Sequence, residues 1–130
     1  MALLLITHDL GVVADTCAST NVMYGGRIVE SAATRTLFRQ PAHPYTVALL
    51  RSIPTLAGHR KGRLATIDGQ PPVLRAAPVG CTFAPRCDRA LDRCRTDTPP
   101  LTVGADGHAA ACWNPVGAPV SPEGERPALT

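Results

Sequence analysis

The sequence is short of aromatic residues and of long apolar runs. Only 4% of its 130 residues are aromatic, so large side chains that anchor a core are scarce. No apolar run approaches the roughly 20 residues that a membrane-spanning helix needs. Residues 1–5, MALLL, lack the basic flank and cleavage site of a secretory signal peptide. We therefore expect a soluble or peripheral chain.

Neither basic nor acidic residues are in large excess. Thirteen basic residues against ten acidic ones leave a net charge of +3. A charge this small does not indicate nucleic acid or an anionic membrane as a partner. The length suits one modest domain or a piece of a larger protein.

Residues 2–14, ALLLITHDLGVVA, form the most informative stretch. The unbroken apolar run, which ends at Thr7, predicts a strand covered on both faces in a parallel sheet. His8 then lies at the carboxyl end of this strand, where ligands bind in open α/β sheets. Thr7 or Asp9 is the predicted N-cap of a helix that begins at Leu10. The alternative is that His8 is only a polar residue at the end of a strand.

This stretch and residues 21–30, NVMYGGRIVE, resemble the end of the ATP-binding subunit of an ABC transporter. The resemblance implies that His8 is the switch-loop histidine, which reaches the terminal phosphate of ATP. An imidazole can donate a hydrogen bond to a γ-phosphate oxygen and help to hold the attacking water. The resemblance also implies ATP and Mg²⁺ as cofactors of the intact subunit.

Local patterns predict a hairpin and three helices. The Gly25-Gly26 pair is the turn between strands at residues 20–24 and 27–31. Helices are expected at residues 10–17, where Cys17 is a small buried residue at the end, at 33–39, and at 44–52. Residues 43–54, HPYTVALLRSIP, resemble the junction that oligopeptide and dipeptide ABC import ATPases carry after their nucleotide-binding domain.

Four of the five cysteines lie in the second half, and we call them the four-cysteine set: Cys81, Cys87, Cys94 and Cys112. No CxxC pair occurs, so the usual zinc-ribbon signature is absent. Without a secretory signal, a metal site is favoured over disulfides. Four thiolates satisfy either tetrahedral zinc or the irons of a cubane cluster. Interleaved arginines are expected to lower the thiol pKa values: Arg86, Arg89, Arg93 and Arg95.

The surrounding sequence, from GCTFAPRC at residues 80–87 to Cys112, resembles the cysteine-bearing C-terminal extension of the peptide-importer ATPases. Some members of that group hold a [4Fe–4S] cluster on four cysteines at these positions. The resemblance favours a cluster on the four-cysteine set, ahead of zinc and ahead of buried or disulfide-linked cysteines. His108 is an alternative ligand, although a place in a turn or beside a ligand is expected for it.

The 130 residues contain no GxxxxGK[ST] phosphate loop, no LSGGQ-like signature and no apolar strand that ends in Asp-Glu. We therefore expect an α/β fragment that hydrolyses no ATP by itself. The resemblance implies the C-terminal remnant of an ABC-type nucleotide-binding domain, followed by a small irregular cysteine-rich extension. The predicted boundaries are 1–56 for the ATP-binding domain segment, 57–115 for the extension and 116–130 for a disordered tail.

The resemblance implies that the intact protein couples ATP hydrolysis to the import of peptides or related solutes. Its partners are then the missing N-terminal half, a second ATP-binding subunit and transmembrane permease subunits. Its expected location is cytoplasmic and peripheral, on the inner face of the cell membrane. The alternative function is a free-standing interaction module that binds zinc or an iron–sulfur cluster.

Overall fold

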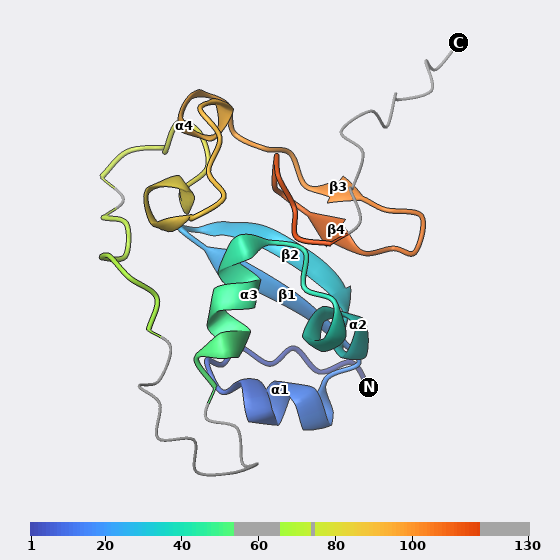
Figure 1. Cartoon of the computed structure of the whole chain (residues 1–130). Helices are drawn as coiled ribbons and strands as arrows, with labels where there is room; N and C mark the ends of the chain where they lie inside the picture. The colour runs from blue at the N-terminus through green and yellow to red at the C-terminus, as the bar shows by residue number, and fades with distance from the viewer. Residues whose placement is uncertain (54–65, 74, 118–130) are drawn as a thin grey trace.

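The computed structural model describes residues 1–53, 66–73 and 75–117. These residues form short helices and one antiparallel sheet with the strand order β1-β2-β4-β3 (Figure 1). The elements in chain order are α1 (Leu10–Thr16), β1 (Ser19–Tyr24), β2 (Arg27–Ala33), α2 (Thr34–Arg39), α3 (Pro44–Arg51), the 3-10 helix η1 (Ala84–Arg86), α4 (Arg93–Thr96), β3 (Thr102–Val103) and β4 (Ala109–Ala110). The predicted boundary at residues 56 and 57 lies outside the described residues, as does the predicted tail beyond residue 117. None of the described helices is long and apolar enough to cross a membrane.

The predicted hairpin is confirmed, and its turn lies against the second half of the chain. Gly25 and Gly26 have φ values of 55° and 75°, which suit the tight turn of a two-residue hairpin. A Cβ on Gly25 would lie 2.8 Å from the Cβ of Thr82. Glycine is therefore needed at this position both for the backbone and for the close approach of Thr82.

The three predicted helices are confirmed within one or two residues at each end. Asp9 is the N-cap of α1, since its Oδ1 accepts hydrogen bonds from the backbone N–H groups of Gly11 and Val12 at 2.9 and 3.2 Å. Pro44 is the first residue of α3, and His43 caps this helix by accepting from the Tyr45 N–H at 3.0 Å.

The strand predicted near the N-terminus is wrong for this structure. Residues 1–7 form no strand, and the side chains of Leu3, Leu4 and Ile6 are 84%, 84% and 90% exposed. A strand covered on both faces needs neighbouring strands, and the described residues supply none beside this segment. Cys17, expected to be buried at the end of α1, is half-buried.

The core joins the predicted domain segment and the predicted extension. It consists of Val22, Tyr24, Val29, Ala32, Leu37 and Phe83. Phe83 comes from the cysteine-bearing segment, whereas the other members come from the hairpin and α2. The sheet crosses the same boundary, because β4 pairs with β2 through Glu30 opposite Ala110 and Ser31 opposite Ala109.

The scarce aromatic residues are concentrated at this junction. The ring centroid of Tyr24 lies 4.5 Å from that of Tyr45 and 5.2 Å from that of Phe83. Tyr45 and Phe83 are 5.4 Å apart. Such tilted and edge-on pairs add to the burial of apolar area, so three of the five aromatic side chains connect β1, α3 and the cysteine-bearing segment.

Candidate functional site

His8 lies on the surface immediately before α1. His8 is exposed, and so are residues 1–7, which precede it. Thr7 Oγ1 accepts from the Asp9 N–H at 3.0 Å, and Asp9 caps the helix, so the backbone on both sides of His8 is held by local hydrogen bonds. This arrangement leaves the imidazole free of any hydrogen-bond partner among the described residues and open to a ligand.

The four-cysteine set lies around one place in the fold. Cys81 precedes η1, Cys87 is its C-cap, Cys94 lies in α4 and Cys112 follows β4. All four line one cavity of about 10 Å³ between η1, α4 and the start of α3. Cys17 is not among its lining residues. The segment with η1 and α4 lies at the end of the molecule away from α1, so the cysteines are separate from His8 (Figure 1).

Gly80 permits the close crossing that brings Cys81 and Cys94 together. The Cys81 N–H donates to the Cys94 carbonyl oxygen at 2.7 Å. Gly80 has a φ of 77°, and a Cβ at this residue would lie 2.5 Å from the same carbonyl oxygen. Any other residue would push the two segments apart at the point where two of the cysteines meet.

Backbone N–H groups point toward the sulfur atoms of the four-cysteine set. The Leu91 N–H donates to Cys94 Sγ and the Asn114 N–H donates to Cys112 Sγ, both at 3.4 Å. The backbone at Phe83 and Ala84 interacts in the same way with Cys81, and the backbone at Arg89 with Cys87. Donors placed in this manner stabilise thiolate or metal-bound sulfur more than they stabilise a neutral thiol.

The expectation that nearby arginines lower the thiol pKa values is wrong. Burial raises the pKa of Cys81 and Cys87, and it raises the pKa of Cys112 to about 11. The guanidinium groups bind elsewhere: Arg86 donates to the Ile67 and Asp68 carbonyls, Arg89 to Asn114, and Arg93 stacks on Trp113. Neutral thiols are therefore favoured here until a cation displaces their protons.

The ligand types of the four-cysteine set suit a metal centre, but the positions of the four side chains do not. Four cysteines with backbone donors are the ligands expected for zinc or a [4Fe–4S] cluster. Yet no group of three or more His, Cys, Asp or Glu side chains in the described ranges is arranged to hold a metal ion. A cavity of about 10 Å³ has room for one water at most, so a cluster needs the cysteine-bearing segments to move apart.

A buried carboxylate connects the hairpin to both flanking segments. Glu30 on β2 is fully buried and accepts hydrogen bonds from the backbone N–H groups of Ala42 and His43 at 2.7 and 2.9 Å. Its other contact is with His108 Nε2, which lies 2.6 Å from Glu30 Oε1. The backbone of His108 lies in the turn between β3 and β4, where a turn position was expected, and its carbonyl oxygen accepts from the Gly104 N–H at 2.8 Å. Its ring reaches the buried Glu30.

His43 is a second buried titratable group beside this carboxylate. It is 1% exposed, and burial lowers its pKa to about 4, although Glu30 and the backbone of Ala111 partly oppose this change. Nδ1 accepts the Tyr45 N–H, so the proton of the neutral ring is on Nε2. Nε2 interacts with the backbone of Ala111, but it forms no hydrogen bond of standard geometry among the described residues.

We expect acid to destabilise the chain through His43. The unfolded chain takes up a proton near pH 6.5, whereas the folded chain resists it until about pH 4. The free energy of unfolding should therefore fall by about 3 kcal/mol between these two pH values. Urea denaturation at pH 7.5 and pH 4.5 measures the change. The variant His43→Asn keeps a side-chain cap on α3 but cannot titrate, so its loss over the same range should be smaller by about that amount. Equal losses in both proteins would contradict the assignment.

Comparison with known proteins identifies the family. Residues 29–94, about half of the chain, match the family described as "Oligopeptide/dipeptide transporter, C-terminal region". The chain belongs to this family. It is similar to the C-terminal part of the ATP-binding subunits of oligopeptide and dipeptide ABC importers, as the resemblance predicted.

Three relatives of the family illustrate the extent of the similarity. The chain is 53% identical to the "Probable peptide ABC transporter ATP-binding protein y4tR" of Sinorhizobium fredii, over 86% of the chain and 33% of the relative. It is 46% identical to the "Dipeptide transport ATP-binding protein DppD" of Escherichia coli, over 89% of the chain and 35% of the relative. The "Oligopeptide transport ATP-binding protein OppD" of Salmonella typhimurium is 44% identical, over 88% and 34%. The chain thus spans about a third of the length of these curated relatives.

The match to the oligopeptide/dipeptide transporter family covers residues on both sides of the contact between the predicted domain segment and the predicted extension. It begins at Val29 and ends at Cys94, so Glu30, His43 and three of the four cysteines lie inside it, whereas His108 and Cys112 lie beyond it. Sequence reasoning did not single out Glu30. The available signal was a lone acid after the apolar pair Ile28-Val29 in a strand, but its three partners come from segments 12 to 78 residues away.

Proposed function

We propose that the intact protein couples ATP hydrolysis to the import of peptides or related small solutes. The chain forms the C-terminal part of its ATP-binding subunit. The observation that carries this proposal is the family match over half of the chain, together with relatives named as ATP-binding proteins of peptide importers. ATP and Mg²⁺ are the cofactors of the intact subunit in this proposal. Its partners are the N-terminal part of the subunit, a second ATP-binding subunit and the permease subunits, on the inner face of the cell membrane.

His8 is the residue of this chain that contacts ATP in the proposed function. It donates a hydrogen bond to the γ-phosphate as charge develops there in the transition state. Its exposure and its position before a capped helix support this role. The exposed apolar residues of the segment 2–6 belong to the same proposed domain segment, residues 1–56, and are covered by strands of the N-terminal part.

A chimaera tests the proposed function. Its N-terminal part comes from the Sinorhizobium relative, and this chain replaces the region of that relative to which it aligns. The isolated chain should hydrolyse no ATP above background, because one histidine cannot hold a triphosphate and its metal. The chimaera should show magnesium-dependent turnover. A soluble, folded chimaera without turnover would contradict the proposal.

We also propose a metal centre on the four-cysteine set, within an extension that covers residues 57–115. A [4Fe–4S] cluster is the first choice and zinc the second. The convergence of the four side chains on one cavity and the backbone donors at their sulfur atoms support it. When bound, the metal supplies a cross-link between η1, α4 and the segment after β4. A free-standing metal-binding interaction module is the second candidate function, which the same cysteines support.

A further inference from the structure

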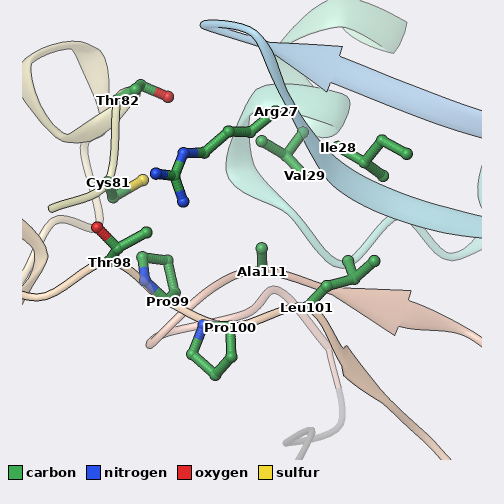
Figure 2. Close-up of a pocket in the computed structure, with 10 residues that line it drawn as sticks. All are labelled: Arg27, Ile28, Val29, Cys81, Thr82, Thr98, Pro99, Pro100, Leu101 and Ala111. Atoms are coloured by element: carbon green, nitrogen blue, oxygen red, sulfur yellow. The ribbon is translucent and has the colours of Figure 1, made fainter. Parts of the chain in front are cut away.

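A cavity lies between the hairpin turn and the segment before β3. Its volume is about 440 Å³, which is within the range of small-molecule sites. Figure 2 shows the Arg27 side chain reaching into it from the start of β2, toward Cys81 and Thr98. Pro99, Pro100 and Leu101 form the wall on the other side.

Arg27 gives this cavity a positive charge that the lining does not neutralise. No acidic residue lines the cavity, and no described residue forms an ion pair or a hydrogen bond with the Arg27 side chain. Thr82, which also lines the cavity, has a hydroxyl with no hydrogen-bond partner among the described residues. The cavity therefore offers a planar five-donor guanidinium and one further hydroxyl donor to an anion.

The lining favours a carboxylate over a phosphate. Phosphate dianions are typically held by several cations or by a helix N-terminus. This cavity has one cationic residue in its lining, Arg27, and no helix N-terminus. A single guanidinium matches the charge and the two oxygens of one carboxylate. Pro99, Pro100 and Leu101 would be in contact with the rest of the ligand, so an apolar group is favoured at that position.

We infer that the cavity between the hairpin turn and residues 98–101 binds a small organic monocarboxylate that carries an apolar side chain. Arg27 binds the carboxylate as a bidentate pair, and the proline-rich wall covers the apolar group. This site is separate from the ATP contact at His8 and goes beyond the proposed function. It shares only the Cys81 side chain with the lining of the four-cysteine cavity.

Nuclear magnetic resonance of the full 130-residue chain tests the inference, with N-acetyl-L-leucine as the probe. Its saturable binding should shift the resonances of Arg27, Thr82 and Leu101. The uncharged N-acetyl-L-leucinamide has nearly the same shape, and it should bind about tenfold more weakly or worse, because it lacks the charged hydrogen bonds. Acetate lacks the apolar group and should also bind more weakly than N-acetyl-L-leucine.

Two matched variants complete the test. Arg27→Gln removes the guanidinium from an exposed residue and should keep the wild-type spectrum while it weakens N-acetyl-L-leucine binding about tenfold or more. Arg35→Gln makes the same change on the exposed side of α2, outside the cavity, and should bind as the wild type does. The inference is overturned by equal binding to Arg27→Gln, by equal binding of the amide, by tighter binding of inorganic phosphate, or by no saturation below about 10 mM.

Discussion

Replacement of Glu30 by alanine is expected to lower the free energy of unfolding by about 3–5 kcal/mol. The carboxylate is fully buried and accepts from two backbone N–H groups and from His108. Without it, these donors remain inside the protein with no acceptor, and a cavity opens between β2, β4 and the start of α3. Since small domains have only about 5–15 kcal/mol of stability, the variant should be close to unfolded.

Chemical denaturation measures this loss, and two further variants define its cause. Glu30→Gln keeps the shape and one acceptor oxygen, so it should lose less than Glu30→Ala. Asp15→Ala removes an exposed carboxylate without a hydrogen bond among the described residues, and its effect should stay within about 0.5 kcal/mol. A loss below about 1 kcal/mol in Glu30→Ala would show that the carboxylate does not connect the two segments.

The second large effect is expected at the four-cysteine set. Protein purified without oxygen should be brown and contain iron and acid-labile sulfide. Serine at any one of the four positions should release the metal and unfold the cysteine-bearing segment, because binding free energy there is also folding free energy. Cys17→Ser is the control. This variant should leave the metal in place, because Cys17 does not line the cavity.

Metal analysis and thiol titration distinguish the alternatives. A colourless protein with one zinc per chain would favour the second choice of metal. If anaerobic protein contains neither iron nor zinc and keeps its fold with free thiols, the metal proposal is wrong. Burial raises the pKa values of Cys81, Cys87 and Cys112, so metal uptake should release protons and weaken as the pH falls.

The sequence predicted the elements whose signals are local. Asp9 caps α1, Gly25 and Gly26 form the hairpin turn, and Pro44 begins α3, because each acts through its own backbone geometry or through hydrogen bonds within three residues. The four-cysteine set was expected to hold one metal centre, which stays a prediction: its members line one cavity, but no group of three or more among the described residues is arranged to hold a metal ion.

The errors concern residues whose environment depends on distant segments. The apolar segment at residues 2–6 is not a strand here, because pairing depends on strands that the described residues do not contain. Burial raises the pKa values of Cys81, Cys87 and Cys112, and the neighbouring arginines do not lower them, because their guanidinium groups donate to carbonyls and to Asn114 instead. Glu30 was missed for the same reason, since a carboxylate in a strand is usually solvated, and only the fold places three donors around it.

The rate of magnesium-dependent ATP hydrolysis by the chimaeric subunit, with and without His8→Ala, is the most direct test of the proposed role of this chain. Nucleotide affinity is measured in parallel. We predict that turnover falls about a hundredfold or more, because the histidine acts where charge develops in the transition state. Nucleotide affinity should change little, because the phosphate loop of the N-terminal part carries ground-state binding. Wild-type turnover in the His8→Ala protein, or equal losses of affinity and turnover, would contradict the proposal.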